Sequence, residues 1–301
     1  MPARPIPRPG RFGLAALGAV AASVLAAAAA GPGPVDSAAA TSSSAPDGPA
    51  TSRAKGRLMI TIVYDNYPLK EGLRTAWGFG CVVQGLEKTI LFDTGGNGRL
   101  LLANMAACGI RPETIDAVVI SHRHGDHAGG LEAFLAAGAK VPVYVPKPFP
   151  DGIKEAIRRA GATLVETEAA TAVCDRAWTT PVLGRGLKEQ ALALEATDGL
   201  VVVTGCAHPG VVEMAESARK HAGRPVRAVL GGFHMMCASQ RGILEVVEGL
   251  RRLGVRQVGP CHCSGDRTRK VMQEAYGEGY LQAGVGARLA FPLTPEKSLS
   301  R

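Results

Sequence analysis

Apolar residues along this chain fall into short runs that end at glycine, proline or polar residues. Three of these runs, 58–64, 89–92 and 118–120, are continuous, which predicts strands buried on both faces. A further strand is predicted over 77–84, whereas 161–195 shows no clear period. Apolar residues recur with helical spacing over 242–253. Strands that alternate with helices predict a single α/β domain over 58–293.

The first 57 residues have a different composition. Residues 1–11 contain arginines and no acid, and an apolar run over 12–30 is followed by alanine-rich candidate cleavage sites. This layout predicts a signal peptide over 1–40 and therefore an exported, periplasmic or extracellular protein. An uncleaved N-terminal membrane anchor is the alternative. Residues 41–57 read as a flexible linker, and 294–301 as a tail.

Charge and cysteine content limit the partners. The formal net charge is +8, but six basic and two acidic residues lie in 1–57, so the remainder carries +4. That balance suits a small, anionic substrate, and no basic run with interleaved aromatics indicates nucleic acid. The seven cysteines are irregularly spaced, which argues against a full disulfide framework and leaves one or two bridges open. The sequence does not indicate an oligomeric state.

Histidine and aspartate cluster directly after the run 118–120. Residues two apart on an extended segment point the same way, so His122 and His124 can bind one ion. Asp126 and His127 follow a turn at Gly125 and can face a second ion. Imidazole and carboxylate ligands suit Zn²⁺, with Mn²⁺ or Fe as alternatives.

Six of the seven histidines follow the end of a predicted strand. Three of them lie in the first cluster, and His208, His234 and His262 each come after a later strand and beside glycine or proline. Only His221 lies elsewhere, on a polar helix face. This distribution predicts a metal or catalytic site built from strand-to-helix loops.

The motif His-x-His-x-Asp-His after a hydrophobic strand resembles the signature of the metallo-β-lactamase superfamily. Later motifs resemble the branch named after 7,8-dihydropterin-6-yl-methyl-4-(β-D-ribofuranosyl)aminobenzene 5'-phosphate synthase. They are Thr-Gly-Cys-Ala-His-Pro-Gly at 204–210, Gly-Gly-Phe-His at 231–234 and Pro-Cys-His-Cys-Ser-Gly at 260–265. The resemblance covers the whole predicted domain.

The resemblance implies a four-layer αβ/βα sandwich, in which two mixed sheets pack face to face with helices outside. It also implies two sets of metal ligands at one edge of the sandwich. The first ion would be held by His122, His124 and His208, and the second by Asp126, His127 and His262.

One departure concerns a bridging carboxylate. Most dinuclear members place an Asp between the last two ligand histidines, yet this chain has no Asp from 199 to 265. The strand ends there offer Cys206 and His234, so a second ion is weaker, absent or held by an unusual ligand. Cys206 can also be read as a small buried residue. Asp93 is either an acceptor that orients a ligand histidine or a turn and helix cap.

The ligands predict hydrolysis by metal-bound hydroxide on an ester, lactone, thioester or phosphoester. Asp126 would steer the hydroxide, and His234, if it is not a ligand, would donate to an oxyanion. One rival function is transferase chemistry like that of the dihydropterin synthase, and export argues against it. The other is a non-catalytic metal-binding or ligand-sensing protein.

Overall fold

The structure is a computed structural model that describes residues 56–294. The predicted signal peptide, most of the linker and nearly all of the tail lie outside these residues. Within residues 56–294, no helix has the length and apolar character needed to cross a membrane.

The first sheet has seven strands. Three neighbouring pairs along β3, β4, β5 and β6 are parallel, and the remaining pairs are antiparallel. In spatial order the strands are β13 (Arg288–Pro292), β1 (Arg57–Tyr64), β2 (Gly80–Gln84), β3 (Ile90–Phe92), β4 (Ala117–Val119), β5 (Pro142–Pro146) and β6 (Thr163–Thr167).

The second sheet has six strands, and only β10, β11 and β12 run parallel to one another. In spatial order they are β12 (Gln257–Cys261), β11 (Val226–Gly232), β10 (Gly199–Thr204), β9 (Leu192–Ala196), β8 (Ala177–Thr179) and β7 (Thr171–Cys174). Both sheets are therefore mixed, as predicted.

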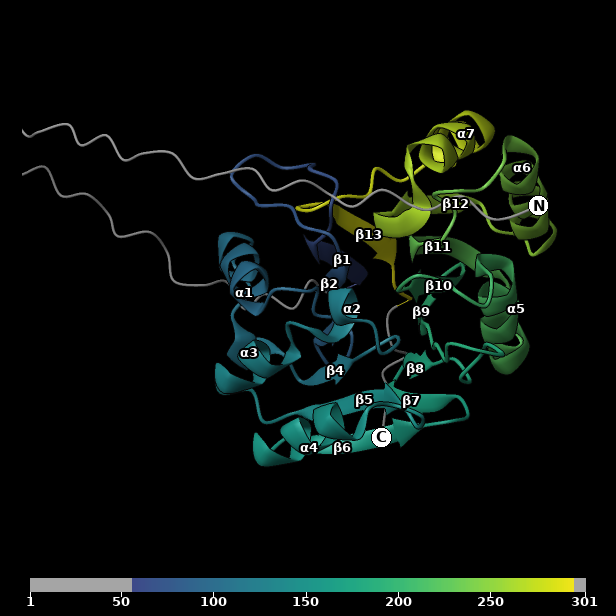
Figure 1. The fold of residues 1–301 in the computed structure, drawn as a ribbon. Helices are drawn as coiled ribbons and strands as arrows, with labels where there is room; N and C mark the ends of the chain where they lie inside the picture. Colours follow the sequence, from purple (N-terminus) through teal and green to yellow (C-terminus); the bar gives the residue numbers. More distant parts are fainter. Residues whose placement is uncertain (1–55, 295–301) are drawn as a thin grey trace, which may run out of the picture. The chain divides into compact units, whose positions relative to one another are not determined.

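Helices cover the outer face of each sheet (Figure 1). Those of the first half are α1 (Gly98–Ala107), α2 (Gly125–Ala128), α3 (Leu131–Ala136) and α4 (Asp151–Arg159). Those of the second half are α5 (Val211–Ala222), α6 (Gln240–Arg252) and α7 (Asp266–Tyr276). Short 3₁₀ turns occupy Pro112–Thr114, His262–Ser264 and Gly277–Gly279.

Alternating side chains divide the core into layers. In β10, Val201 and Val203 enter the cluster between the two sheets, whereas Leu200 and Val202 pack with the helices of the second half. The same period of two places Leu58, Ile60 and Ile62 of β1 between the sheets. A separate cluster lies under α1, α3 and α4. These layers confirm the predicted α/β four-layer sandwich.

Two sequence predictions of strands need correction. The strand predicted over 77–84 begins only at Gly80, because Gly78 has a φ of +137° and a Cβ there would lie 2.3 Å from the Asp126 carbonyl oxygen. Residues 161–195, which showed no period, contain β6, β7 and β8 and lead into β9. Their exposure is irregular because these strands lie toward the sheet edges.

Candidate metal centre

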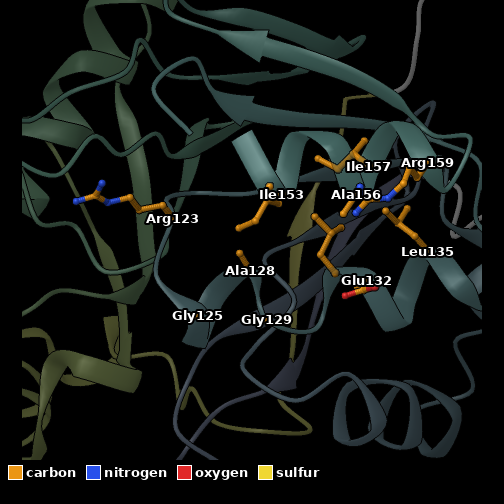
Figure 2. A pocket seen from close by; sticks show the side chains of 12 residues that line it. Arg123, Gly125, Ala128, Gly129, Glu132, Leu135, Ile153, Ala156, Ile157 and Arg159 are labelled. Carbon is orange, nitrogen blue, oxygen red and sulfur yellow. The ribbon is translucent and has the colours of Figure 1, made fainter. Parts of the chain in front are cut away.

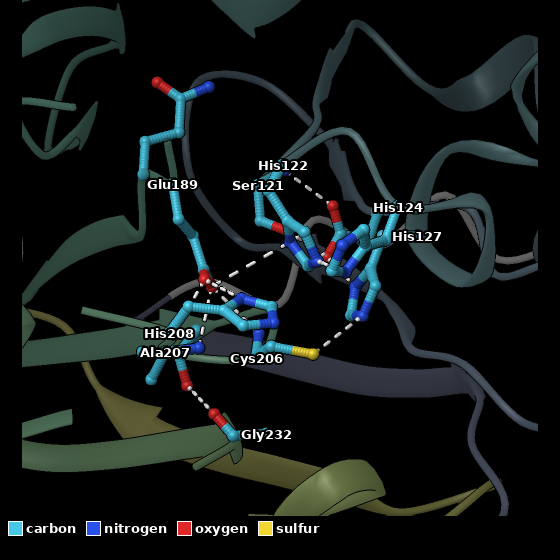
Figure 3. A network of polar contacts seen from close by, with 12 residues as sticks. Ser121, His122, His124, His127, Glu189, Cys206, Ala207, His208 and Gly232 are labelled. Atoms are coloured by element: carbon cyan, nitrogen blue, oxygen red, sulfur yellow. Dashed lines mark hydrogen bonds and ion pairs between the residues drawn. The ribbon is translucent and has the colours of Figure 1, made fainter. Parts of the chain in front are cut away.

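The predicted ligands meet where five strands end. Those from the first sheet follow β4, those from the second follow β10, β11 and β12, and Asp93 follows β3. The carboxyl ends of parallel strands present their loops at a common edge, which is where α/β folds usually place a site. Figure 3 shows side chains from both sheets converging there.

The structure brings two sets of donors together. His122, His124 and His208 place one donor atom each within 4.8 Å of one another. Asp126, His127 and His262 do the same. These are the two sets implied by the resemblance, although the loops that supply them are as much as 140 residues apart, from 122 to 262.

Asp93 anchors the first half of the centre. Its fully buried carboxylate accepts from the Ser121 backbone N–H and hydroxyl, both at 2.7 Å, and from His127 Nδ1 at 2.7 Å. The Ser121 hydroxyl lies 2.8 Å from His122 Nδ1. Asp93 therefore orients the candidate ligand His127 directly and His122 through Ser121, while the cap of α1 is Asn97. Burial raises the pKa of Asp93 to about 7.

Glu189 anchors the second half, and the sequence analysis missed it. It is fully buried and accepts from the backbone N–H groups of Cys206, Ala207 and His208 at 2.7–2.9 Å. It also accepts from His208 Nδ1 at 2.7 Å. Burial acts to raise the pKa of Glu189, but these hydrogen bonds, with His208 foremost, outweigh it and lower the pKa to about 2. The one signal in the sequence is an acid two residues before an apolar run, 191–194.

The protonation and orientation of the buried histidine rings suit cation binding. Burial lowers the pKa of His122 and of His127 to about 3, so both rings are neutral at pH 7. With the proton on Nδ1 facing Asp93, His127 turns the lone pair of Nε2 toward His262 Nε2, 3.2 Å away. His262 Nδ1 faces Asn66 Oδ1 at 3.1 Å. Two facing lone pairs repel unless a cation lies between them, so this donor set fits a zinc-class ion.

Asp126 adds the carboxylate of the second set. Its Oδ2 lies 3.3 Å from His262 Nε2 and 3.6 Å from His127 Nε2. Partial burial acts to raise its pKa, but contacts with His262 and His127 outweigh that effect and hold the pKa well below its usual range. The carboxylate is therefore ionised at neutral pH and can bind a cation or orient a water.

Cys206 lies between the two histidine sets. Its buried Sγ is 3.1 Å from His127 Nε2, and it forms a donor group with His122 and His127. It also forms one with His234 and Cys263. A hydrogen bond from Cys206 lowers the pKa of the Cys263 thiol to about 4 and raises that of Cys206. Cys206 is thus both a small buried residue and within reach of two ligand groups.

His234 is exposed, and its ring lies 4.3 Å from the ring of His208. Its backbone N–H donates to Cys263 Sγ at 3.3 Å, and a side-chain hydrogen bond with Cys263 raises its pKa.

Backbone strain is concentrated in the loops of the candidate site. Four of the five non-glycine residues with positive φ among residues 56–294 lie there, namely Asp93, Ala207, His234 and His262. All seven cysteines lie within residues 56–294, and none of them forms a disulfide.

Two exposed side chains flank the donors. Trp77 is 49% exposed, and its ring centroid lies 4.7 Å from that of His262. Arg123 is exposed between two ligand histidines. A pocket of about 290 Å³ lies between α2, α3 and α4, and none of the donor side chains lines it (Figure 2). Its lining is mainly apolar, and Arg123 points away from it.

Comparisons with known proteins agree with the fold. Residues 81–213 match the family model of the metallo-beta-lactamase superfamily. Over 252 residues the chain is 28% identical to the 7,8-dihydropterin-6-methyl-4-(beta-D-ribofuranosyl)-aminobenzene-5'-phosphate synthase of Methanocaldococcus jannaschii, covering 69% of this chain and 86% of that protein. The crystal structure of Tm1679, a metal-dependent hydrolase of the beta-lactamase superfamily, is 25% identical, with a TM-score of 0.67 over 77% of this chain and 98% of that one.

A diphosphatase from the PhnP family shares the fold at 17% identity, with a TM-score of 0.52 over 79% of this chain and 98% of that one. Fold and sequence matches together define a protein with the metallo-β-lactamase fold. Residues 81–213 thus form a region of the metallo-β-lactamase superfamily type, and the chain as a whole resembles the dihydropterin synthase branch.

Proposed function

We propose that this protein is a metal-dependent hydrolase that cleaves an ester, lactone, thioester or phosphoester bond in a small, anionic molecule. The observation that carries the proposal is the pair of donor sets. Hydrogen bonds at Nδ1 orient His127 and His208, and the donor atoms of each set lie close together. Zinc is the ion favoured by three imidazoles with an open fourth position. When bound, such an ion supplies Lewis acidity and activates water for attack.

The chain's own residues would divide the remaining work. Asp93 and Glu189 keep His127 and His208 in the tautomer that leaves Nε2 free. Asp126, ionised and partly exposed, would bind a cation and orient the attacking water. His234 was expected to be either a ligand or an oxyanion donor, and its contacts with Cys263 favour the ligand role.

The side chains around the donors support a substrate with a flat group and a negative charge. Trp77 offers half of its ring to solvent beside His262, so a planar group can stack on it. Arg123 supplies a positive charge beside His124. The mild positive balance of residues 58–301 adds a weaker, long-range attraction for anions.

A substrate panel tests the hydrolase proposal. The full chain, freed of metal and reloaded with zinc, is assayed against aryl phosphomonoesters and phosphodiesters, lactones, thioesters and a β-lactam. We expect turnover of at least one class, faster when the substrate carries an anionic group, and its loss on chelation. Zinc-loaded protein that turns over none of these compounds would favour a metal-binding or ligand-sensing role.

Dihydropterin transferase chemistry is the second candidate, because the chain is 28% identical to the synthase of M. jannaschii over most of that protein's length. The discriminating assay supplies the aminobenzene ribofuranosyl phosphate and a dihydropterin whose 6-methyl carbon carries a leaving group, such as a diphosphate, which is released when the two are joined. Formation of the joined product, with no hydrolysis in the panel, would establish the synthase-like activity in place of the hydrolase.

We further propose that residues 1–40 are removed on export. The support is the arginine-rich start, the apolar run and the small residues that follow it. Mass spectrometry of the protein from its native host decides the matter. A new N-terminus near residue 40 in the exported fraction is expected, whereas an intact Met1 on membrane-bound protein would identify an anchor instead.

A further inference from the structure

Three neighbouring parallel strands each present a soft or borderline metal ligand at the same distance beyond their ends. Cys206 follows β10 by two residues, His234 follows β11 by two, and Cys263 follows β12 by two. β11 is hydrogen-bonded to β10 on one side and to β12 on the other, and all three are parallel. Equal offsets from adjacent carboxyl ends therefore place the three side chains next to one another.

The contacts confirm this placement. The donor atoms of Cys206, His234 and Cys263 all lie within 4.8 Å of one another, and both cysteines are at most 5% exposed. The close approach depends on Gly232, where a Cβ would lie 2.8 Å from Cys263 Sγ and 2.2 Å from the Gly205 carbonyl oxygen. The backbone of these loops is thus packed as tightly as a glycine permits.

We propose that Cys206, His234 and Cys263 form a third metal position, which binds zinc or a softer ion beside the histidine sets. Two thiolates and one imidazole are a ligand set that zinc accepts with a fourth position open, and sulfur favours zinc and cadmium over manganese or magnesium. His234 and Cys263 belong to neither histidine set, so the position is chemically distinct from them.

The surroundings suit a cation at this point. Cys206 is the residue that links the position to the histidine sets, because its Sγ also contacts His127 Nε2 at 3.1 Å. The exposed ring of His234 leaves one side of the group open to solvent, where a fourth ligand can enter. The ring nitrogen of His234 that ligates an ion here cannot also donate to an oxyanion, so the proposal gives that nitrogen a binding role.

Cobalt binding to the metal-free full chain tests the proposal without any activity assay. Co²⁺ is added stepwise under reducing, oxygen-free conditions, and bound metal is measured by equilibrium dialysis and elemental analysis. Thiolate-to-cobalt charge transfer in the near ultraviolet reports sulfur ligation. We expect three bound ions in the wild type, and two in both Cys263→Ser and His234→Ala, with the charge-transfer band strongly reduced in both variants.

Cys237→Ser is the matched control, because Cys237 is an exposed cysteine three residues from His234 and outside the donor groups. It should bind three ions and keep the band. Circular dichroism verifies that each variant folds, and the exposed position of His234 makes His234→Ala the safer test if Cys263→Ser does not.

Three results would overturn the proposal. The first is a number of bound ions that is the same in the wild type, Cys263→Ser and His234→Ala. The second is a band lost in Cys206→Ser but retained in both Cys263→Ser and His234→Ala, which would show Cys206 serving the histidine sets alone. The third is a Cys206–Cys263 disulfide that persists under the reducing conditions and excludes cobalt.

Discussion

The two sheets supply the candidate centre in opposite ways. After β4, four donors come from one loop, 122–127, so a single stretch of sequence carries half of the site. In the second sheet each of β10, β11 and β12 contributes one or two donors, and only their adjacency assembles them. The donors of the first sheet depend only on the local sequence, whereas those of the second depend on the order and register of the strands. An error of register among β10–β12 would therefore displace the donors of the second sheet and leave those of the loop 122–127 in place.

Each half also relies on one buried carboxylate, and the two differ in charge state. Asp93 receives one backbone N–H, one hydroxyl and one imidazole, and burial leaves its pKa at about 7. Glu189 receives three backbone N–H groups and an imidazole, and its pKa falls to about 2. Hydrogen-bond donors and neighbouring charges together oppose the burial that would neutralise a carboxyl, and they prevail at Glu189 but not at Asp93.

The largest expected effect tests whether the two halves share one ion. His122→Ala and His208→Ala remove donors from different sheets but from the same set, so each should lose that ion and lower turnover of any hydrolysed substrate by about a hundredfold or more. Elemental analysis and the substrate panel measure both effects. His221→Ala, in α5 and outside the donor groups, is the control. Full zinc content with full activity in either ligand variant would contradict the shared set.

The second prediction separates the two carboxylates in the metal-free protein. Glu189→Gln removes a charge that four donors face and turns an NH₂ toward some of them, so we expect a loss of about 3–5 kcal/mol in the free energy of unfolding. Asp93→Asn replaces a carboxyl that is close to half protonated at pH 7 and should cost only about 1 kcal/mol. Urea unfolding followed by circular dichroism measures both.

Asp93→Asn should nonetheless weaken metal binding. An amide nitrogen facing His127 Nδ1 would favour the tautomer with the proton on Nε2, where the ion binds, and such changes cost about 10–100-fold in affinity. Equal stability losses in the two variants would mean that the carboxylates do not differ in charge state as described.

The sequence predicts the donors of the loop 122–127 more directly than those that follow β10, β11 and β12. The loop 122–127 is predictable because its ligands lie within six residues after a recognisable strand. His208 and His262 are found because both follow strand ends, and the family resemblance supplies their pairing. Metal binding by these residues remains a prediction, although the structure brings them together.

Glu189 and Cys263 escape sequence analysis for a physical reason. The role of Glu189 depends on backbone N–H groups in the loop after β10. The pattern of apolar and polar residues in the sequence does not indicate such a contact. Cys263 becomes a donor only because β12 lies two strands from β10, which is a matter of sheet order. The fold class was predictable because buried parallel strands are continuous apolar runs, whereas the edge strands β6 and β7 are not.

The third prediction concerns acidification of the metal-free protein. His122 and His127 have a pKa of about 3 when folded against 6.5 when free, so their contribution to stability is present above pH 6.5 and is lost as the pH falls. Asp93 acts oppositely, because its raised pKa gives stability at low pH that is lost as the pH rises through about 7. Two histidines outweigh one aspartate.

Unfolding by urea between pH 6.5 and about 5 should therefore show stability falling as the pH is lowered, by about 1.4 kcal/mol per pH unit for each net proton that the chain takes up on unfolding. The lowered pKa of Cys263 acts in the same direction as the two histidines, and Asp93→Asn should steepen the slope by about one proton. Stability that rises on acidification in the wild type would show that the histidines are not buried in their neutral form.

The smallest expected effect concerns Trp77, the aromatic residue of the first half that packs on a ligand of the second. Its ring is half exposed and contacts His262, so Trp77→Ala should change the free energy of unfolding by no more than about 0.5–1 kcal/mol. A substrate with a planar group should lose stacking of about 1 kcal/mol, which raises KM several-fold and leaves kcat nearly unchanged. Leu69→Ala, an equally exposed apolar residue of the same loop, is the matched control and should alter neither constant. If Trp77→Ala lowers kcat with KM constant, Trp77 positions His262 and is not a platform for substrate, and the two halves are then coupled through this contact.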